Sequence, residues 1–207
     1  MQLKLVIVGI GGQGVLFATH VLSQTALALG EEVIGAETHG MSQRGGSVIS
    51  HLKIGAHGGP LVRQGTADAC LALDPDEGYK ALGFLRDGGV CFVNTGRPNY
   101  PSPEIAAHLA QRGIEMHVLN ADAIAMELGS PALANVALIG FALAHPAFPF
   151  PYSAVEETVT RVSKERFRAA NLEALARGFA AGQSISRPAT EPSGHLVTQL
   201  ANPGDKP

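Results

Sequence analysis

The sequence predicts an α/β domain with three layers, in which a largely parallel, Rossmann-like sheet carries helices on both faces. Two observations favour this class. Apolar runs of strand length alternate along the chain with segments in which apolar residues recur every three or four positions. The first apolar run also leads directly into a glycine-rich loop and a helix, which is the order typical of a βαβ unit.

Six apolar segments have the length and composition of strands. Each is bounded by glycine, proline or polar residues, and together they cover residues 3–9, 31–37, 47–55, 67–74, 90–94 and 114–120. The fourth of them ends at Asp74-Pro75, a pair that favours a turn before the next helix.

Besides the helix expected after Asp74-Pro75, two helices are predicted between these strands. Residues 14–29 place apolar side chains at three- and four-residue steps, and Gly30 ends the segment. Residues 102–113 begin with Ser102, followed by proline and glutamate, and end at Gly113, which are the usual start and stop signals of a helix.

The C-terminal half of the domain is predicted to be mostly helical from about residue 121. Ser153 and Glu156 have the spacing of a capping box, in which the two side chains satisfy free amide groups at a helix start. Residues 164–182 form a final predicted helix, which Gly182 is expected to end.

One domain over residues 1–182 and a flexible tail over 183–207 are expected. A chain of 207 residues with 45% hydrophobic residues can bury a full core, whereas the tail is rich in proline, serine and glycine and has no sustained period. The apolar start has no signal-peptide pattern, and no apolar run is long enough to cross a membrane. We therefore expect a cytoplasmic protein without a membrane partner.

Charge and cysteine content exclude several classes of function. The net charge is −3 and the 15 basic residues are scattered, which gives no reason to expect a nucleic acid as partner. Cys70 and Cys91 lie in apolar runs, as expected for reduced, buried thiols, and two cysteines cannot supply the four thiolates of an iron–sulfur cluster. The eight histidines show no familiar ligand spacing, so no metal site is predicted. Nor does any residue pattern indicate a catalytic nucleophile.

The loop after the first strand carries a dinucleotide-binding pattern. Gly9, Gly11 and Gly14 fit G-x-G-x-x-G between a strand and a helix, where free amide groups can face a pyrophosphate. Glu37 lies at about the distance where such sites place the carboxylate that binds a ribose. These features leave two interpretations open: a stand-alone oxidoreductase that binds NAD(P) or FAD, or a tight strand-to-helix connection packed against protein.

A second polar, glycine-bearing stretch follows Glu37. Gln43, Arg44, Gly45 and Gly46 lie in it, where a dinucleotide fold would begin its next crossover helix. Such a loop can shape itself around a ligand or a neighbouring chain, and the forked guanidinium of Arg44 can bind a carboxylate or a phosphate. The alternative is a surface loop with a solvated arginine.

Together, "GIGGQGV" and "ETHGMSQRGGSVISH" resemble the gamma-type subunit of the 2-oxoacid:ferredoxin oxidoreductases, in particular the small (beta) subunit of the indolepyruvate enzymes. The resemblance spans roughly residues 3–182 and continues through "ADACLALDPDE", "LNADAIAMELGSPALANVALIGFAL" with Asn135, and "AANLEALARGFAAG" with Asn171.

The resemblance implies that the cofactors and this chain belong to different subunits of one complex. Thiamine diphosphate and the iron–sulfur clusters would belong to a large (alpha) subunit, and this chain would bind neither. The complex would decarboxylate an arylpyruvate, pass electrons to ferredoxin and transfer the acyl group to coenzyme A. Residues 9–14 would then form an interface or an anion-binding loop, in which Gly11, Gly12 and Gln13 offer backbone amides to the coenzyme A phosphates or to a nucleotide.

Overall fold

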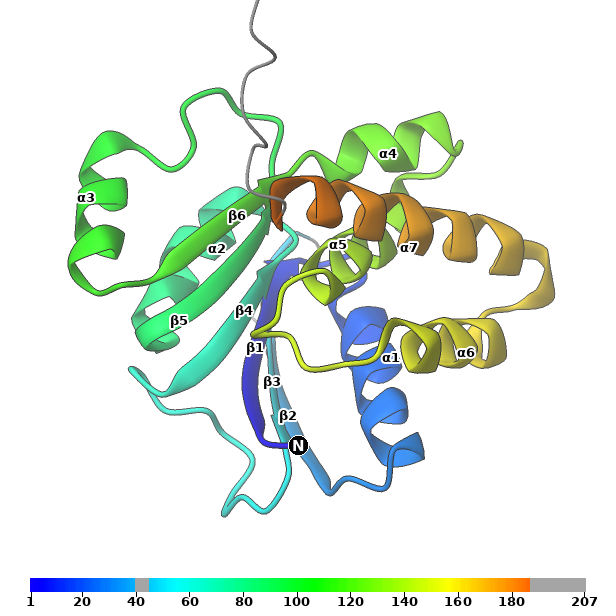
Figure 1. Ribbon diagram of the computed structural model, residues 1–207, viewed down its shortest axis with the longest axis horizontal. Coiled ribbons are helices and arrows are strands. Elements are labelled where there is room, and N and C mark those ends of the chain that lie inside the picture. The colour runs from blue at the N-terminus through cyan, green and yellow to red at the C-terminus, as the bar shows by residue number, and fades with distance from the viewer. Residues whose placement is uncertain (40–44, 187–207) are drawn as a thin grey trace, which may run out of the picture.

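Six strands form one mixed sheet in the order β2-β3-β1-β4-β5-β6 in the computed structural model, which describes residues 1–39 and 45–186 (Figure 1). Each predicted strand segment overlaps one of these strands, and the fifth strand begins five residues before the predicted segment 90–94. The elements in chain order are β1 (Leu3–Ile10), α1 (Val15–Ala28), β2 (Val33–His39), β3 (Ser47–Ile54), β4 (Ala67–Ala72), α2 (Pro75–Ala81), a 3₁₀ turn (Leu82–Phe84), β5 (Leu85–Asn94), α3 (Pro103–Gln111), β6 (Glu115–Leu119), α4 (Ala121–Glu127), a second 3₁₀ turn (Pro131–Leu133), α5 (Ala134–Leu143), α6 (Tyr152–Val162) and α7 (Glu165–Ser186).

Five of the six strands run in the same direction, which confirms the prediction of a largely parallel sheet. β1, β4, β5 and β6 pair in parallel, whereas β3 is antiparallel to both of its neighbours, β1 and β2. The reversal follows from the connection between β2 and β3. Residues 40–46 are too few for the crossover helix that a parallel neighbour would need.

Helices cover both faces of the sheet, as predicted. In Figure 1, α1, α5, α6 and α7 lie on one side and α2 and α3 on the other. Successive residues of β1 alternate between the two cores: Leu5 and Ile7 pack in the larger one, under α1 and α5, whereas Val6 and Val8 pack in the smaller one, under α2 and α3. The central strand is therefore buried on both sides, which gives the three layers.

Local signals place two of the helix starts correctly and one wrongly. Asp74 caps α2 by accepting hydrogen bonds from the amides of Asp76 and Glu77, and Ser102 caps α3. The capping box predicted at Ser153 is wrong. α6 begins one residue earlier, after Pro151, and Ser153 already lies inside the helix, so no side chain of the described residues caps it.

α5 and α7 cross so closely that glycines form the contact. A Cβ at Gly178 would overlap the carbonyl oxygen of Ala137, and a Cβ at Gly140 would overlap that of Leu175. Gly182 faces α5 in the same way, and α7 continues four residues beyond it. The predicted helix stop at Gly182 is therefore wrong: this glycine allows a close approach of two helices and does not end one.

The predicted tail lies, from residue 187 onward, outside the described residues. Among the helices of the described part, none has both the length and the apolar content needed to cross a membrane.

We predict that Gly178→Ala lowers the free energy of unfolding by about 2–3 kcal/mol, because the added methyl group forces α7 away from α5. Urea denaturation of the purified chain measures this. Gly83→Ala is the matched control, since a Cβ at Gly83 meets no heavy atom within 4 Å. Equal stability of Gly178→Ala and the wild type would contradict the close crossing.

Candidate functional site

The glycine loop after β1 is closed by hydrogen bonds of its own. Gln13 accepts a bond from the amide of Ile10 through its side-chain Oε1 at 2.8 Å, and its own amide donates to the carbonyl of Ile10 at 3.1 Å. Gly12 and Gly14 have φ angles of 101° and 86°, a region that favours glycine. A Cβ at Gly9 would lie 2.8 Å from Gln13 Oε1, so the loop needs a glycine there too.

The structure brings the glycine loop together with the second glycine-bearing loop. The amide of Gly11 donates to the carbonyl of Gly46 at 2.9 Å. Gly11, Gly12 and Gly45 are exposed, so these three glycines share one surface at the end of β1. Gln43 and Arg44, the other predicted site residues of the second loop, lie outside the described residues.

These hydrogen bonds reduce the number of amides that the loop can offer to an anion. The amides of Gly11 and Gln13, two of the three expected donors, are already bound to carbonyl groups. Within the described residues, the structure records no hydrogen bond for the amide of Gly12. The loop therefore has the glycine spacing of a nucleotide-binding loop, but it offers fewer free backbone amides than such a loop needs.

Glu37 does not lie beside the glycine loop. It is exposed on β2 opposite Ser50 of β3, which in turn lies opposite Ile7 of β1. Two strand spacings, about 10 Å, therefore separate it from β1. Glu37 instead lines a cavity of about 440 Å³ that α1 borders with His20 and Ser23. The insertion of β3 thus removes the carboxylate from the place where a dinucleotide fold would use it.

Asn135, at the start of α5, holds the glycine loop from the other side. Its side-chain Nδ2 donates to the carbonyls of Gln13 and Gly14 at 3.4 and 3.3 Å. A Cβ at Gly14 would overlap this Nδ2, so the last glycine of the motif makes room for the asparagine. Asn135 is only 4% exposed, and among the described residues its Oδ1 has no hydrogen-bond partner.

The role of Asn135 depends on a contact between distant parts of the chain. The contact joins residues 121 positions apart, and a polar residue at the start of an apolar helix is the only local signal.

An apolar cavity of about 300 Å³ adjoins Gly14 and Asn135. Phe17 and Leu133 line it together with Phe167, whose side chain is 47% exposed. An exposed apolar side chain such as that of Phe167, next to an apolar hollow, is one feature of a protein contact surface. The region around the loop is therefore suited to packing against another chain.

Comparison with known proteins places this domain among oxidoreductase subunits. Residues 4–181 match the family model described as pyruvate ferredoxin/flavodoxin oxidoreductase. A protein from Archaeoglobus fulgidus called indolepyruvate oxidoreductase subunit IorB is 36% identical over 197 residues, which cover 90% of this chain and 97% of that protein.

Two solved structures have the same fold. One is the gamma subunit of a keto/oxoacid ferredoxin oxidoreductase from Geobacter sulfurreducens, with a TM-score of 0.68, 23% identity and coverage of 88% of this chain and 99% of that one. The other is a 2-oxoglutarate:ferredoxin oxidoreductase from Magnetococcus marinus, with a TM-score of 0.73, 20% identity and coverage of 90% of this chain and 32% of that one.

We predict that Asn135→Asp lowers the free energy of unfolding by about 2–4 kcal/mol, because a buried carboxylate would face the carbonyls of Gln13 and Gly14 without a donor. Asn120→Asp is the matched control. Asn120 caps α4 through its oxygen, which aspartate keeps. If chemical denaturation found the two variants equally stable, Asn135 would not hold the loop through its amide donor.

Proposed function

The chain belongs to the pyruvate ferredoxin/flavodoxin oxidoreductase family, and from this premise we propose that it is the small subunit of an indolepyruvate or other arylpyruvate ferredoxin oxidoreductase. As a member of this family, it is a subunit of an oxoacid oxidoreductase that works with larger partner subunits. In the proposed reaction, the complex oxidatively decarboxylates the oxoacid, passes two electrons to ferredoxin and transfers the acyl group to coenzyme A.

The observation that carries the proposal is the match in length with a relative of known role. The chain covers 97% of the subunit called indolepyruvate oxidoreductase subunit IorB, at 36% identity. The same fold makes up only 32% of the Magnetococcus marinus chain. A domain that occurs both as a separate chain and as a third of a longer one is suited to a stable contact with the rest of its complex.

We propose that thiamine diphosphate and the iron–sulfur clusters are held by the large (alpha) subunit. The two cysteines of this chain, Cys70 and Cys91, are fully buried and pair in register on β4 and β5. The neighbouring Cys70 thiol and burial raise the pKa of Cys91, which opposes the thiolate form that a cluster requires. This chain would pack against the large subunit and hold it in position. The chain would not be catalytic alone.

The glycine-loop surface is the proposed contact with the large subunit or with coenzyme A. The exposed glycines of both loops and the apolar cavity beside Gly14 lie on the same part of the domain. Exposed glycines let another backbone or a phosphate approach closely, because glycine has no side chain.

We predict that the tagged chain, purified without oxygen from its host, brings with it a brown large subunit that contains thiamine diphosphate. The preparation should reduce ferredoxin only when an arylpyruvate and coenzyme A are both present, and comparison of oxoacids would identify the substrate. Mass spectrometry and visible absorption measure the composition. A chain that emerges alone with a bound nicotinamide or flavin nucleotide would overturn the proposal.

We predict that Gly12→Leu weakens assembly with the large subunit or raises the KM for coenzyme A by about tenfold or more, because the side chain would project from the exposed loop. Gly30→Leu is the matched control. Gly30 also has a positive φ, 81°, and open space around its Cβ position, but it lies at the opposite end of α1. Both variants carry similar backbone strain, so normal assembly and coenzyme A kinetics in Gly12→Leu would contradict the assigned surface.

A further inference from the structure

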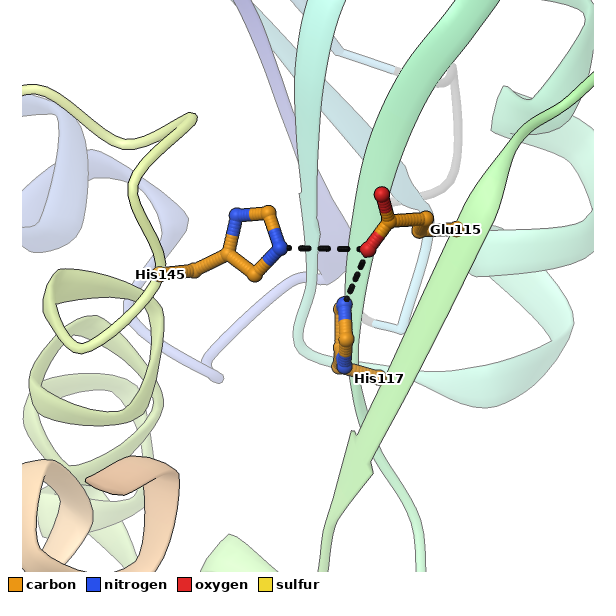
Figure 2. A group of neighbouring side chains, drawn as sticks. All are labelled: Glu115, His117 and His145. Carbon is orange, nitrogen blue, oxygen red and sulfur yellow. Dashed lines mark hydrogen bonds and ion pairs between the residues drawn. The ribbon is translucent and has the colours of Figure 1, made fainter. Parts of the chain in front are cut away.

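Two histidines and a glutamate meet where β6 faces the turn after α5 (Figure 2). The carboxylate Oε2 of Glu115 lies 3.2 Å from Nε2 of His117 and 3.2 Å from Nε2 of His145. The three potential ligand atoms all lie within 4.8 Å of one another. The histidines are 28 positions apart in the chain, which explains why no ligand spacing is visible in the sequence.

The two imidazoles are held by the same aromatic ring. His117 stacks on Phe92 with ring centroids 5.6 Å apart, and His145 meets Phe92 edge-on, also at 5.6 Å. The histidine side chains are 21% and 15% exposed, whereas that of Glu115 is 63% exposed. The cluster therefore has a largely buried side formed by the rings and a side that is open to solvent.

From this arrangement we propose that Glu115, His117 and His145 bind one divalent transition-metal ion, with Zn²⁺ as the best match in chemistry. Imidazole nitrogen and carboxylate oxygen are ordinary Zn²⁺ ligands at about 2.0–2.2 Å, which places neighbouring ligand atoms of a tetrahedral site about 3.3 Å apart. Both oxygen-to-nitrogen distances already match this value. The fourth position would face solvent, where a water molecule or a partner's side chain can occupy it.

A hydrogen bond at Nδ1 of His145 limits the affinity of the site for the metal ion. The amide of Ala147 donates to Nδ1 at 3.2 Å, so in the metal-free chain the ring proton lies on Nε2 and points at Glu115. Binding through Nε2 moves this proton to Nδ1 and loses the bond from Ala147, which weakens binding about 2- to 10-fold. The site is therefore a reversible one, weaker than a structural zinc site with four protein ligands.

The cluster lies away from the proposed interface of the glycine loop. Asn135, near the first residue of α5, contacts the loop, and His145 follows the last turn of the same helix, about 15 Å further on. A bound ion would join the edge strand β6 to the segment between α5 and α6. Metal binding can therefore be tested independently of oxidoreductase activity.

The experiment is calorimetric titration of Zn²⁺ into the full-length chain, without a polyhistidine tag and after removal of metals with a chelator. We expect one ion per chain and, with Co²⁺ as the probe, visible absorption typical of tetrahedral coordination. Glu115→Gln and His117→Gln should each weaken binding by at least about tenfold. Glu115 is largely exposed, so its variant tests the site without disturbing the core.

His108→Gln is the control, because this exposed histidine on α3 is not part of the cluster. Circular dichroism verifies that each variant is folded. Absence of Zn²⁺ binding in the wild type would overturn the proposal. Unchanged affinity in folded Glu115→Gln and His117→Gln variants would also overturn it, as would an equal loss in His108→Gln.

Discussion

The close approach of α5 to its neighbours is the constraint on which the rest of the structure depends. All ten residues of α5 are buried, so the helix must fit between the sheet and the other helices with no face exposed to solvent. Glycines permit this at both contacts: Gly14 leaves room for Asn135, and Gly140 and Gly178 bring α5 and α7 into backbone contact. A side chain at any of these positions would separate layers whose dense packing supplies most of the stability.

The same constraint changes the meaning of the glycine motif. In a dinucleotide fold, such glycines clear a path for a pyrophosphate, and a carboxylate on the neighbouring strand binds the ribose. In this chain the last glycine accommodates Asn135, two of the loop's amides bind internal carbonyls, and β3 separates Glu37 from β1. The motif therefore serves the packing of the domain, and the exposed glycines that remain suit a contact with another chain.

α5 also connects the two functional regions that we propose. Its first turn supports the loop surface where the large subunit or coenzyme A would bind, and its last turn leads to His145 in the cluster with Glu115 and His117. A rigid, fully buried helix fixes the distance between them. An ion at the cluster would stabilise β6, which in the part of the chain that the structure describes pairs with a strand on one side, β5.

The sequence by itself determined those features that depend on neighbouring residues. Apolar runs placed all six strands, and Asp74 and Ser102 marked two helix starts, because capping bonds reach only two or three residues along the chain. Tertiary structure decided what residues far apart in the sequence do together. It alone showed that Gly182 faces α5, that Asn135 reaches Gly14 and that His145 reaches Glu115. Such contacts depend on how the layers pack, and no local pattern of residues encodes them.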